Sequence, residues 1–248
     1  MMMEQEIRAL AEAAKAASYQ LAVLRTDVRN AALDAMADAL TAHMNEILRE
    51  NAEDVAEATS AGIRASYLDR LRLDESRVTA MTEGLRLTAA LPDPLGREDY
   101  SVRRPNGLEI RRVRVPLGVI GMIYEARPNV TADAIGLCLK SGNAVLLRGG
   151  SDALRSNRVI ADILSHAAYG AGVPQGAIQL LAMKNRAAVD VMTHLTGLVD
   201  VIIPRGGAGL IRRIVESSTV PVIETGAGVC HIYVDRAADI GMALRIVE

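Results

Sequence analysis

The sequence is poor in the residues that cross-link a fold or hold a metal. Its 248 residues include only two cysteines, Cys138 and Cys230, which are too few and too far apart for a disulfide framework or a thiolate metal site. The four histidines show no ligand spacing such as His-Glu-x-x-His. We therefore expect no bound metal. Half of the residues are apolar, which is enough to bury the core of one large domain or two modest ones.

Long runs of one charge and long apolar runs are also missing. The 28 basic and 30 acidic residues are well mixed, so neither a nucleic-acid groove nor a polybasic membrane patch is predicted. The longest uncharged stretch, residues 163–183, contains glycines and a proline that would break a membrane-spanning helix. Residues 1–8 lack the basic start of a signal peptide. These absences predict a cytoplasmic protein whose partner is a small molecule.

The first ninety residues have the pattern of helices. From Thr26, a candidate N-cap, apolar side chains recur at helical spacing as far as Leu48 and predict one helix. A second helix is expected from Asp74, with Pro92 beyond its end. We expect these helices to pack as a layer on another element.

The pattern changes at residues 100–115, which are rich in arginine. Asn106-Gly107 is typical of a two-residue type I′ hairpin turn, because both of its central positions need a positive φ. We therefore predict a β-hairpin with arms at about 101–105 and 108–115. A contact in a homo-oligomer and a solvated surface hairpin are equally consistent with this pattern.

From residue 116 onward, short β-rich runs alternate with amphipathic helical windows. This order predicts an α/β fold with a doubly wound parallel sheet, in which ligands bind beyond the carboxyl ends of the strands. The expected strands are 118–124, 144–148, 177–182, 199–203, 220–224 and 231–235, and the expected helices are 131–140, 153–168, 186–194, 208–217 and one that reaches residue 248. The loops that follow the first, second, fourth and fifth strands are the places to search for a site.

The loop after the first strand places an amide at the start of a helix. Pro128 disfavours helical backbone at Arg127, so the helix is expected to begin near Asn129. The Asn129 side chain could donate a hydrogen bond to an oxyanion, or it could simply cap the helix. Spacing alone favours the cap.

Two loops share an Arg-Gly-Gly sequence. Arg148-Gly149-Gly150-Ser151 follows the second strand, and Arg205-Gly206-Gly207 follows the fourth. In each loop the glycines let backbone amides approach a phosphate at a helix start, with a guanidinium beside them. An ordinary glycine turn explains either loop equally well. Two such loops at one edge of a sheet nevertheless support each other as a phosphate site.

Three further residues are candidates for chemistry. Glu224 ends the fifth strand, where a carboxylate could act as a general base or bind a ribose; a solvated acid is equally consistent. Cys138 lies in an apolar helical window, and Cys230 precedes the last strand. Packing is the simpler role for both cysteines.

Four segments, residues 115–131, 139–151, 200–207 and 229–235, together resemble one family. They are similar to glutamate-5-semialdehyde dehydrogenase, also called gamma-glutamyl phosphate reductase, in the aldehyde dehydrogenase superfamily, and the similarity extends over essentially the whole chain. The resemblance implies a cofactor-binding domain with an N-terminal helical part (1–99) and a Rossmann-like NADPH-binding part (116–248), joined through the hairpin (100–115), with the catalytic domain absent.

The resemblance also implies a reaction. The family reduces L-glutamate 5-phosphate to the semialdehyde and phosphate with NADPH, in proline biosynthesis. A cysteine thiolate attacks the acyl phosphate, phosphate leaves, and hydride reaches the resulting thioester. Because negative charge develops on the carbonyl oxygen, an oxyanion donor is needed. By resemblance, Asn129 takes that role, and Arg127 is a candidate partner for the substrate carboxylate.

By the same resemblance, Tyr124 and Glu125 border the cofactor. Arg148 stands where the superfamily has a lysine that reaches the adenosine ribose. Ser151 replaces the acid that NAD-preferring members use to hold the ribose, which removes repulsion of a 2′-phosphate and favours NADPH. The turn after Arg205 falls at the pyrophosphate, and Glu224 falls near the position of a base.

The family's nucleophilic cysteine matches neither Cys138 nor Cys230 and is expected shortly after Glu248. We therefore expect little or no reductase activity from these 248 residues, as an inactive fragment of the enzyme. The alternative is a non-catalytic nucleotide-binding module or scaffold, which would bind NADPH without turnover. A general aldehyde dehydrogenase that uses NAD is disfavoured by Ser151.

Overall fold

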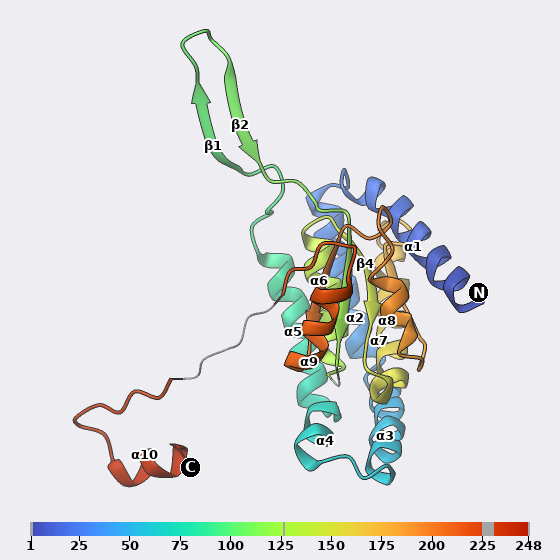
Figure 1. Ribbon diagram of the computed structural model, residues 1–248, viewed down its shortest axis with the longest axis vertical. Helices are drawn as coiled ribbons and strands as arrows, with labels where there is room; N and C mark the ends of the chain where they lie inside the picture. Colours follow the sequence, from blue (N-terminus) through green and yellow to red (C-terminus); the bar gives the residue numbers. More distant parts are fainter. Residues whose placement is uncertain (1, 126, 225–230, 248) are drawn as a thin grey trace.

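The computed structural model describes residues 2–125, 127–224 and 231–247. Its N-terminal part is helical, as expected (Figure 1). The helices are α1 (Met2–Leu21), α2 (Thr26–Ala42), α3 (Met44–Ser60), α4 (Ala65–Leu71) and α5 (Glu75–Ala90). The single helix predicted from Thr26 to Leu48 is wrong, because the backbone leaves helical geometry at His43, with φ −104° and ψ 17°.

The two predicted helix starts fare differently. Asp74 caps α5, and its carboxylate accepts the backbone N–H of Arg77 at 2.8 Å. Thr26 is the first residue of α2 and not its N-cap. Its hydroxyl instead donates to the carboxylate of Asp93, which also accepts from Arg29 at 2.7 Å. The Thr26 hydroxyl therefore binds Asp93, which is distant in sequence, and does not cap the helix.

A two-stranded antiparallel hairpin projects from the body of the molecule (Figure 1). It consists of β1 (Glu98–Arg103) and β2 (Glu109–Val113). The predicted two-residue turn is wrong: the N–H of Gly107 bonds to the C=O of Arg104 at 2.9 Å, so Pro105 and Asn106 lie at its centre. Pro105 suits the second position of a type I turn, and Gly107 follows with φ +86°.

The α/β class predicted from the sequence is confirmed. Four parallel strands form one sheet in the order β5-β4-β3-β6. The strands are β3 (Val119–Tyr124), β4 (Ala144–Arg148), β5 (Ile178–Leu180) and β6 (Val201–Arg205). They alternate with α6 (Asn129–Lys140), α7 (Leu154–Gly170), α8 (Ala187–Met192) and α9 (Ala208–Ser217). Two apolar clusters lie on opposite faces of the sheet, one toward α2, α6 and α7 and the other toward α1 and α8.

The last two predicted strands do not form as expected. Val222 makes a single parallel bridge to Ile202 of β6, so residues 220–224 are an edge contact and not a full strand. Residues 231–235 are assigned no strand, and they are exposed. A strand needs a hydrogen-bonding neighbour, and the described residues provide none for this segment. Helix α10 (Ile240–Val247) follows.

Two further observations concern the described residues as a whole. None of their helices is long and apolar enough to cross a membrane. Within the same residues, histidine, cysteine and acidic side chains nowhere gather in threes or more as a metal site would need.

Candidate functional site

The sheet reverses its order of winding at β3. From β3 the chain crosses to β4 and then to β5 on one side, and it returns to β6 on the other side of β3. The carboxyl ends of β3, β4 and β6 lie together, because Ile123 pairs with Arg148 and Tyr124 pairs with Arg205. In parallel α/β sheets this reversal is where a crevice forms for a ligand.

A cavity of about 370 Å³ lies at this edge of the sheet. This volume is within the range of small-molecule sites. Its lining comes from the ends of β3 and β4 and from α4, α8 and α9, and it comprises Tyr67, Ile123, Tyr124, Glu125, Arg148, Gly150, Ser151, Asp152, Arg186, Val189, Gly209, Leu210 and Arg213. The structure thus brings Tyr124, Glu125, Arg148, Gly150 and Ser151 together, whereas Gly149, Arg205, Gly206 and Gly207 are not in the lining.

Arg148 is the most deeply placed of these charges. The residue is 5% exposed, and its two terminal nitrogens donate to the C=O groups of Gly149 and Asn185. Its Nε is buried and has no partner among the described atoms. Burial, and to a smaller degree the nearby charge of Arg186, lower the pKa of the guanidinium. Arg148 therefore supports the loop from within while retaining one unused donor.

Arg205 does not line this cavity, although the sequence placed its loop beside that of Arg148. Successive side chains of a strand point to opposite faces, and the register aligns Arg205 with Tyr124 but Arg148 with Ile123. Tyr124 belongs to the apolar cluster on the α6 face and Ile123 to the cluster on the other face. The two arginines therefore leave opposite faces of the sheet.

Sequence reasoning missed two arginines that do line the cavity. Arg186 precedes α8, and Arg213 lies on α9, where it pairs with Asp190 at 2.9 Å. Arg186 was expected to be the first residue of a helix at 186–194, and no pattern in the sequence indicated that it lies beside the Arg148 loop.

The glycine turn before α9 is in contact with an acid from β3's loop. The backbone N–H of Gly207 donates to Glu125 Oε2 at 3.0 Å. A Cβ at Gly206 would lie 2.8 Å from the same carboxylate. Because the start of a helix attracts anions, Glu125 lies where a pyrophosphate was expected to bind.

Gly149 is required by packing. A Cβ at this position would lie 2.2 Å from Asn157 Nδ2 and 3.1 Å from the ring of Tyr124. Asn157 accepts a hydrogen bond from Thr131 at 3.0 Å, and the hydroxyls of Thr131 and Tyr124 lie 2.7 Å apart. Burial raises the pKa of Tyr124, so its phenol stays protonated. This network joins β3, α6 and α7 directly behind the loop.

Asn129 lies in a second cavity, of about 350 Å³, which is lined by Asp69, Arg70, Arg72, Leu73, Arg77, Ala80, Met81, Arg127, Asn129 and Asp133. Its side chain provides no helix cap, because Asn129 Nδ2 donates instead to Asp133 at 3.2 Å, one turn along α6. Burial raises the pKa of Asp133, with partial offset from this hydrogen bond and from Arg205. The cavity therefore combines an amide with several arginines.

The remaining candidates are Glu224 and the two cysteines. Glu224 is exposed and lines neither of them. Cys138 is buried in α6, and burial raises the pKa of its thiol to about 12, as suits a packing role. Cys230 lies outside the described residues.

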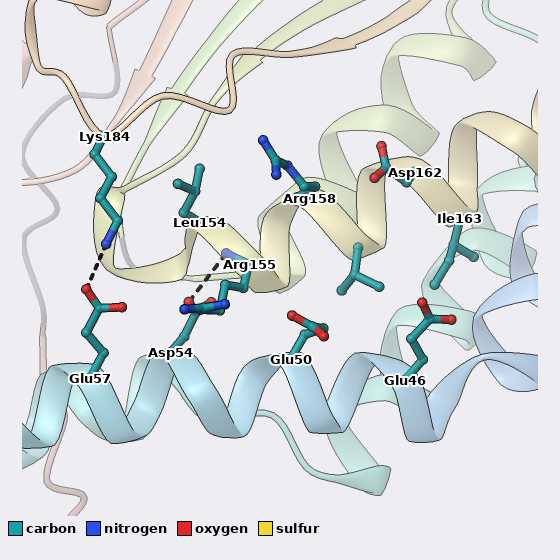
Figure 2. A pocket seen from close by; sticks show the side chains of 11 residues that line it. Glu46, Glu50, Asp54, Glu57, Leu154, Arg155, Arg158, Asp162, Ile163 and Lys184 are labelled. Atoms are coloured by element: carbon teal, nitrogen blue, oxygen red, sulfur yellow. Dashed lines mark hydrogen bonds and ion pairs between the residues drawn. The ribbon is translucent and has the colours of Figure 1, made fainter.

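A third cavity, of about 420 Å³, lies between α3 and α7 (Figure 2). Acids of α3 face α7 across it. Glu57 pairs with Lys184 at 2.7 Å, and Asp54 accepts the backbone N–H of Ser156 at 2.8 Å. Burial raises the pKa of Asp54. Helix α3 therefore holds the start of α7, the helix that follows the Ser151 loop.

This fold, with a crevice at the carboxyl edge of its parallel sheet, is that of a known class of proteins. Residues 1–247 match the aldehyde dehydrogenase family, and the chain belongs to that family. Within it, the chain is similar to gamma-glutamyl phosphate reductases. That of Thermoanaerobacter sp. (strain X514) is 57% identical over 242 residues, which cover 98% of this chain and 58% of the relative. That of Heliobacterium modesticaldum is 53% identical over 247 residues.

Solved structures agree with the sequence relatives. The gamma-glutamyl phosphate reductase of Thermotoga maritima aligns with a TM-score of 0.89 and 40% identity over 98% of this chain and 58% of that one. The Saccharomyces cerevisiae enzyme aligns with a TM-score of 0.81 and 32% identity over 96% of this chain and 61% of that one. The chain thus spans about three fifths of the length of these relatives.

Proposed function

We propose that this chain binds NADPH at the carboxyl edge of its parallel sheet. The cofactor is used to reduce L-glutamate 5-phosphate to L-glutamate 5-semialdehyde. The observation that carries the proposal is the 370 Å³ cavity at the point where the strand order reverses. It combines a glycine loop with the guanidinium groups of Arg148 and Arg186. The names of the relatives support the substrate.

The lining fits the adenosine 2′-phosphate end of NADPH. The unused buried Nε of Arg148 and the side chain of Arg186 supply positive charge, and Ser151 is small and adds no negative charge. In this arrangement Arg148 holds the loop, and Arg186 is the better placed of the two for a 2′-phosphate because it is exposed. NADPH would supply the hydride.

We assign the substrate to the 350 Å³ cavity beside Asn129. The second N–H of the Asn129 amide is available to an oxyanion, since the first is held by Asp133. Arg70, Arg72 and Arg127 provide charge for the carboxylate and phosphoryl groups of glutamyl phosphate. Cys138 does not serve as the nucleophile in this proposal, because it is buried with a raised thiol pKa.

The proposal is tested by calorimetric titration of the chain with NADPH and with NADH. We expect NADPH to bind more tightly. Arg186→Gln should weaken NADPH about tenfold while changing NADH little, because a phosphate–guanidinium contact is lost only from the former. Arg212→Gln is the control, since Arg212 lies on α9 but does not line the cavity.

Two results would contradict the proposal. If neither dinucleotide bound, the cavity would not be a cofactor site. If NADH bound better and Arg186→Gln affected both equally, a general NAD-dependent aldehyde dehydrogenase would be the better description.

The proposal extends to the hairpin. Every strand residue of β1 and β2 except Val102 is exposed, and these include Tyr100, Ile110 and Val113, each at least 43% exposed. We propose that a second copy of the chain covers them. Replacing Tyr100 and Ile110 with serine should then lower the mass measured by light scattering, and an unchanged mass would count against this contact.

A further inference from the structure

Tyr67 connects the N-terminal helices to the cofactor loop. Its hydroxyl, on α4, donates to Asp152 Oδ2 at 2.8 Å, across 85 positions of sequence. The other carboxylate oxygen of Asp152 lies 3.3 Å from Ser151 Oγ. Tyr67, Ser151 and Asp152 all line the 370 Å³ cavity. The carboxylate is therefore held between two hydroxyl donors at the proposed cofactor site.

Asp152 changes the expected effect of Ser151. The serine was expected to favour NADPH because it leaves no acid near the 2′-phosphate, yet the structure places an acid directly beside it. A free carboxylate here would repel the 2′-phosphate of NADPH. It could also accept a hydrogen bond from the ribose 2′-hydroxyl of NADH. The orientation of Asp152 therefore bears directly on the choice of cofactor.

The Tyr67 hydroxyl is suited to restrain this carboxylate. Burial and the hydrogen bond to Asp152 raise the pKa of Tyr67, so the phenol remains a proton donor throughout the neutral range. While its proton engages Oδ2, that oxygen is turned toward α4 and part of its charge is offset by a hydrogen bond.

The backbone that follows Asp152 is held by hydrogen bonds from α3. Asp54 accepts the N–H and the hydroxyl of Ser156 at 2.8 and 2.7 Å, and Asn51 donates to the same hydroxyl at 3.0 Å. Figure 2 shows α3 lying along the start of α7, with Asp54 directed to its backbone. These hydrogen bonds hold the backbone N–H groups of Arg155 and Ser156, three and four residues after Asp152.

We propose that Tyr67 is a positioning residue for cofactor choice: by holding the Asp152 carboxylate, it keeps that acid away from the adenosine ribose and favours NADPH over NADH. The inference rests on the proposed cofactor site.

The test compares NADPH and NADH affinities by calorimetry. Tyr67→Phe keeps the ring but removes the donor, and it should lower the preference for NADPH about fivefold, the size of one screened charge interaction. Adding Asp152→Asn to Tyr67→Phe should restore the preference, because the charge is then gone. Tyr169→Phe is the control, since its hydroxyl also makes a partly buried hydrogen bond, to Ile178, but lines no part of this cavity.

The outcomes distinguish a failure of this inference from a failure of the proposed NADPH site. A wild-type chain that binds neither dinucleotide would overturn both. A wild-type chain that binds NADPH, with a Tyr67→Phe variant that loses both dinucleotides equally, would show a structural role and overturn the inference alone. The same holds if Asp152→Asn fails to restore the preference. Titration with adenosine 2′,5′-bisphosphate against AMP repeats the comparison without the nicotinamide half, and an unchanged ratio there in Tyr67→Phe would also overturn it.

Discussion

The carboxylate of Glu125 accepts the backbone N–H of Gly207 at 3.0 Å, so a side chain from the β3 loop occupies the first turn of α9. A helix start that holds an acid has already used one of the amides that a phosphate would need. Glu125 and a bound pyrophosphate would therefore compete for the same position.

Replacing Glu125 with Gln should strengthen NADPH binding about threefold to tenfold, because the repulsion between carboxylate and pyrophosphate disappears while the side chain keeps its size. Calorimetric titration at low ionic strength measures the effect. Glu216→Gln, on α9 but not in the lining of the cavity, serves as the control. Weaker binding in Glu125→Gln would indicate that the acid helps to hold the cofactor.

Gly149→Ala should destabilise the chain by about 1–3 kcal/mol, the usual cost of an overpacked site. Its Cβ would displace Asn157 and disturb the bond that Asn157 accepts from Thr131. Urea denaturation measures the free energy of unfolding. Gly170→Ala, near the end of α7 where a Cβ meets nothing within 4 Å, should be neutral or slightly stabilising. Equal stability of the two variants would show that Asn157 moves aside at no cost.

Cys138 should resist alkylation in the folded chain. Burial in α6 raises its thiol pKa to about 12, so almost no thiolate is present at pH 8 and reagents cannot reach the sulfur. Iodoacetamide labelling followed by mass spectrometry, in a Cys230→Ser variant, isolates this thiol. We expect labelling only after unfolding in urea. Rapid modification of the native chain would contradict a packing role.

The stability of the chain should depend on the titration of Asp54. Burial raises the pKa of Asp54, so the folded state binds the proton more tightly than the unfolded chain. Its contribution to stability is therefore largest below the unfolded-state pKa of about 4 and is lost as pH rises through the folded-state pKa.

Asp54→Asn cannot titrate and still presents an oxygen to Ser156. Relative to this variant, the wild-type free energy of unfolding should fall as the pH rises from about 4, and then level off. Urea denaturation across this range gives the difference. A wild-type gain over the same range would show that the ionised form is favoured by the start of α7.

Local signals predicted the elements that local chemistry controls. Strand β4 and helix α9 have the predicted bounds. The signals that mark them, a β-rich run that ends in Arg-Gly-Gly and an amphipathic window after a glycine turn, each lie within a short stretch of sequence. The hairpin turn was misplaced because the Asn-Gly signal was considered without Pro105, which has no N–H to pair. The break at His43 carried no local signal.

The sequence by itself determined the class of fold, the loops at the carboxyl edge of the sheet and the family to which the chain belongs, because each depends on short patterns along the chain. Only the tertiary structure decided that Arg148 and Arg205 leave opposite faces, and that Arg186 joins the cavity. It also decided that Tyr67 reaches Asp152. The physical reason is that strand register and helix packing bring together side chains that are tens of residues apart in the sequence. A local sequence pattern does not indicate which of these side chains will come into contact.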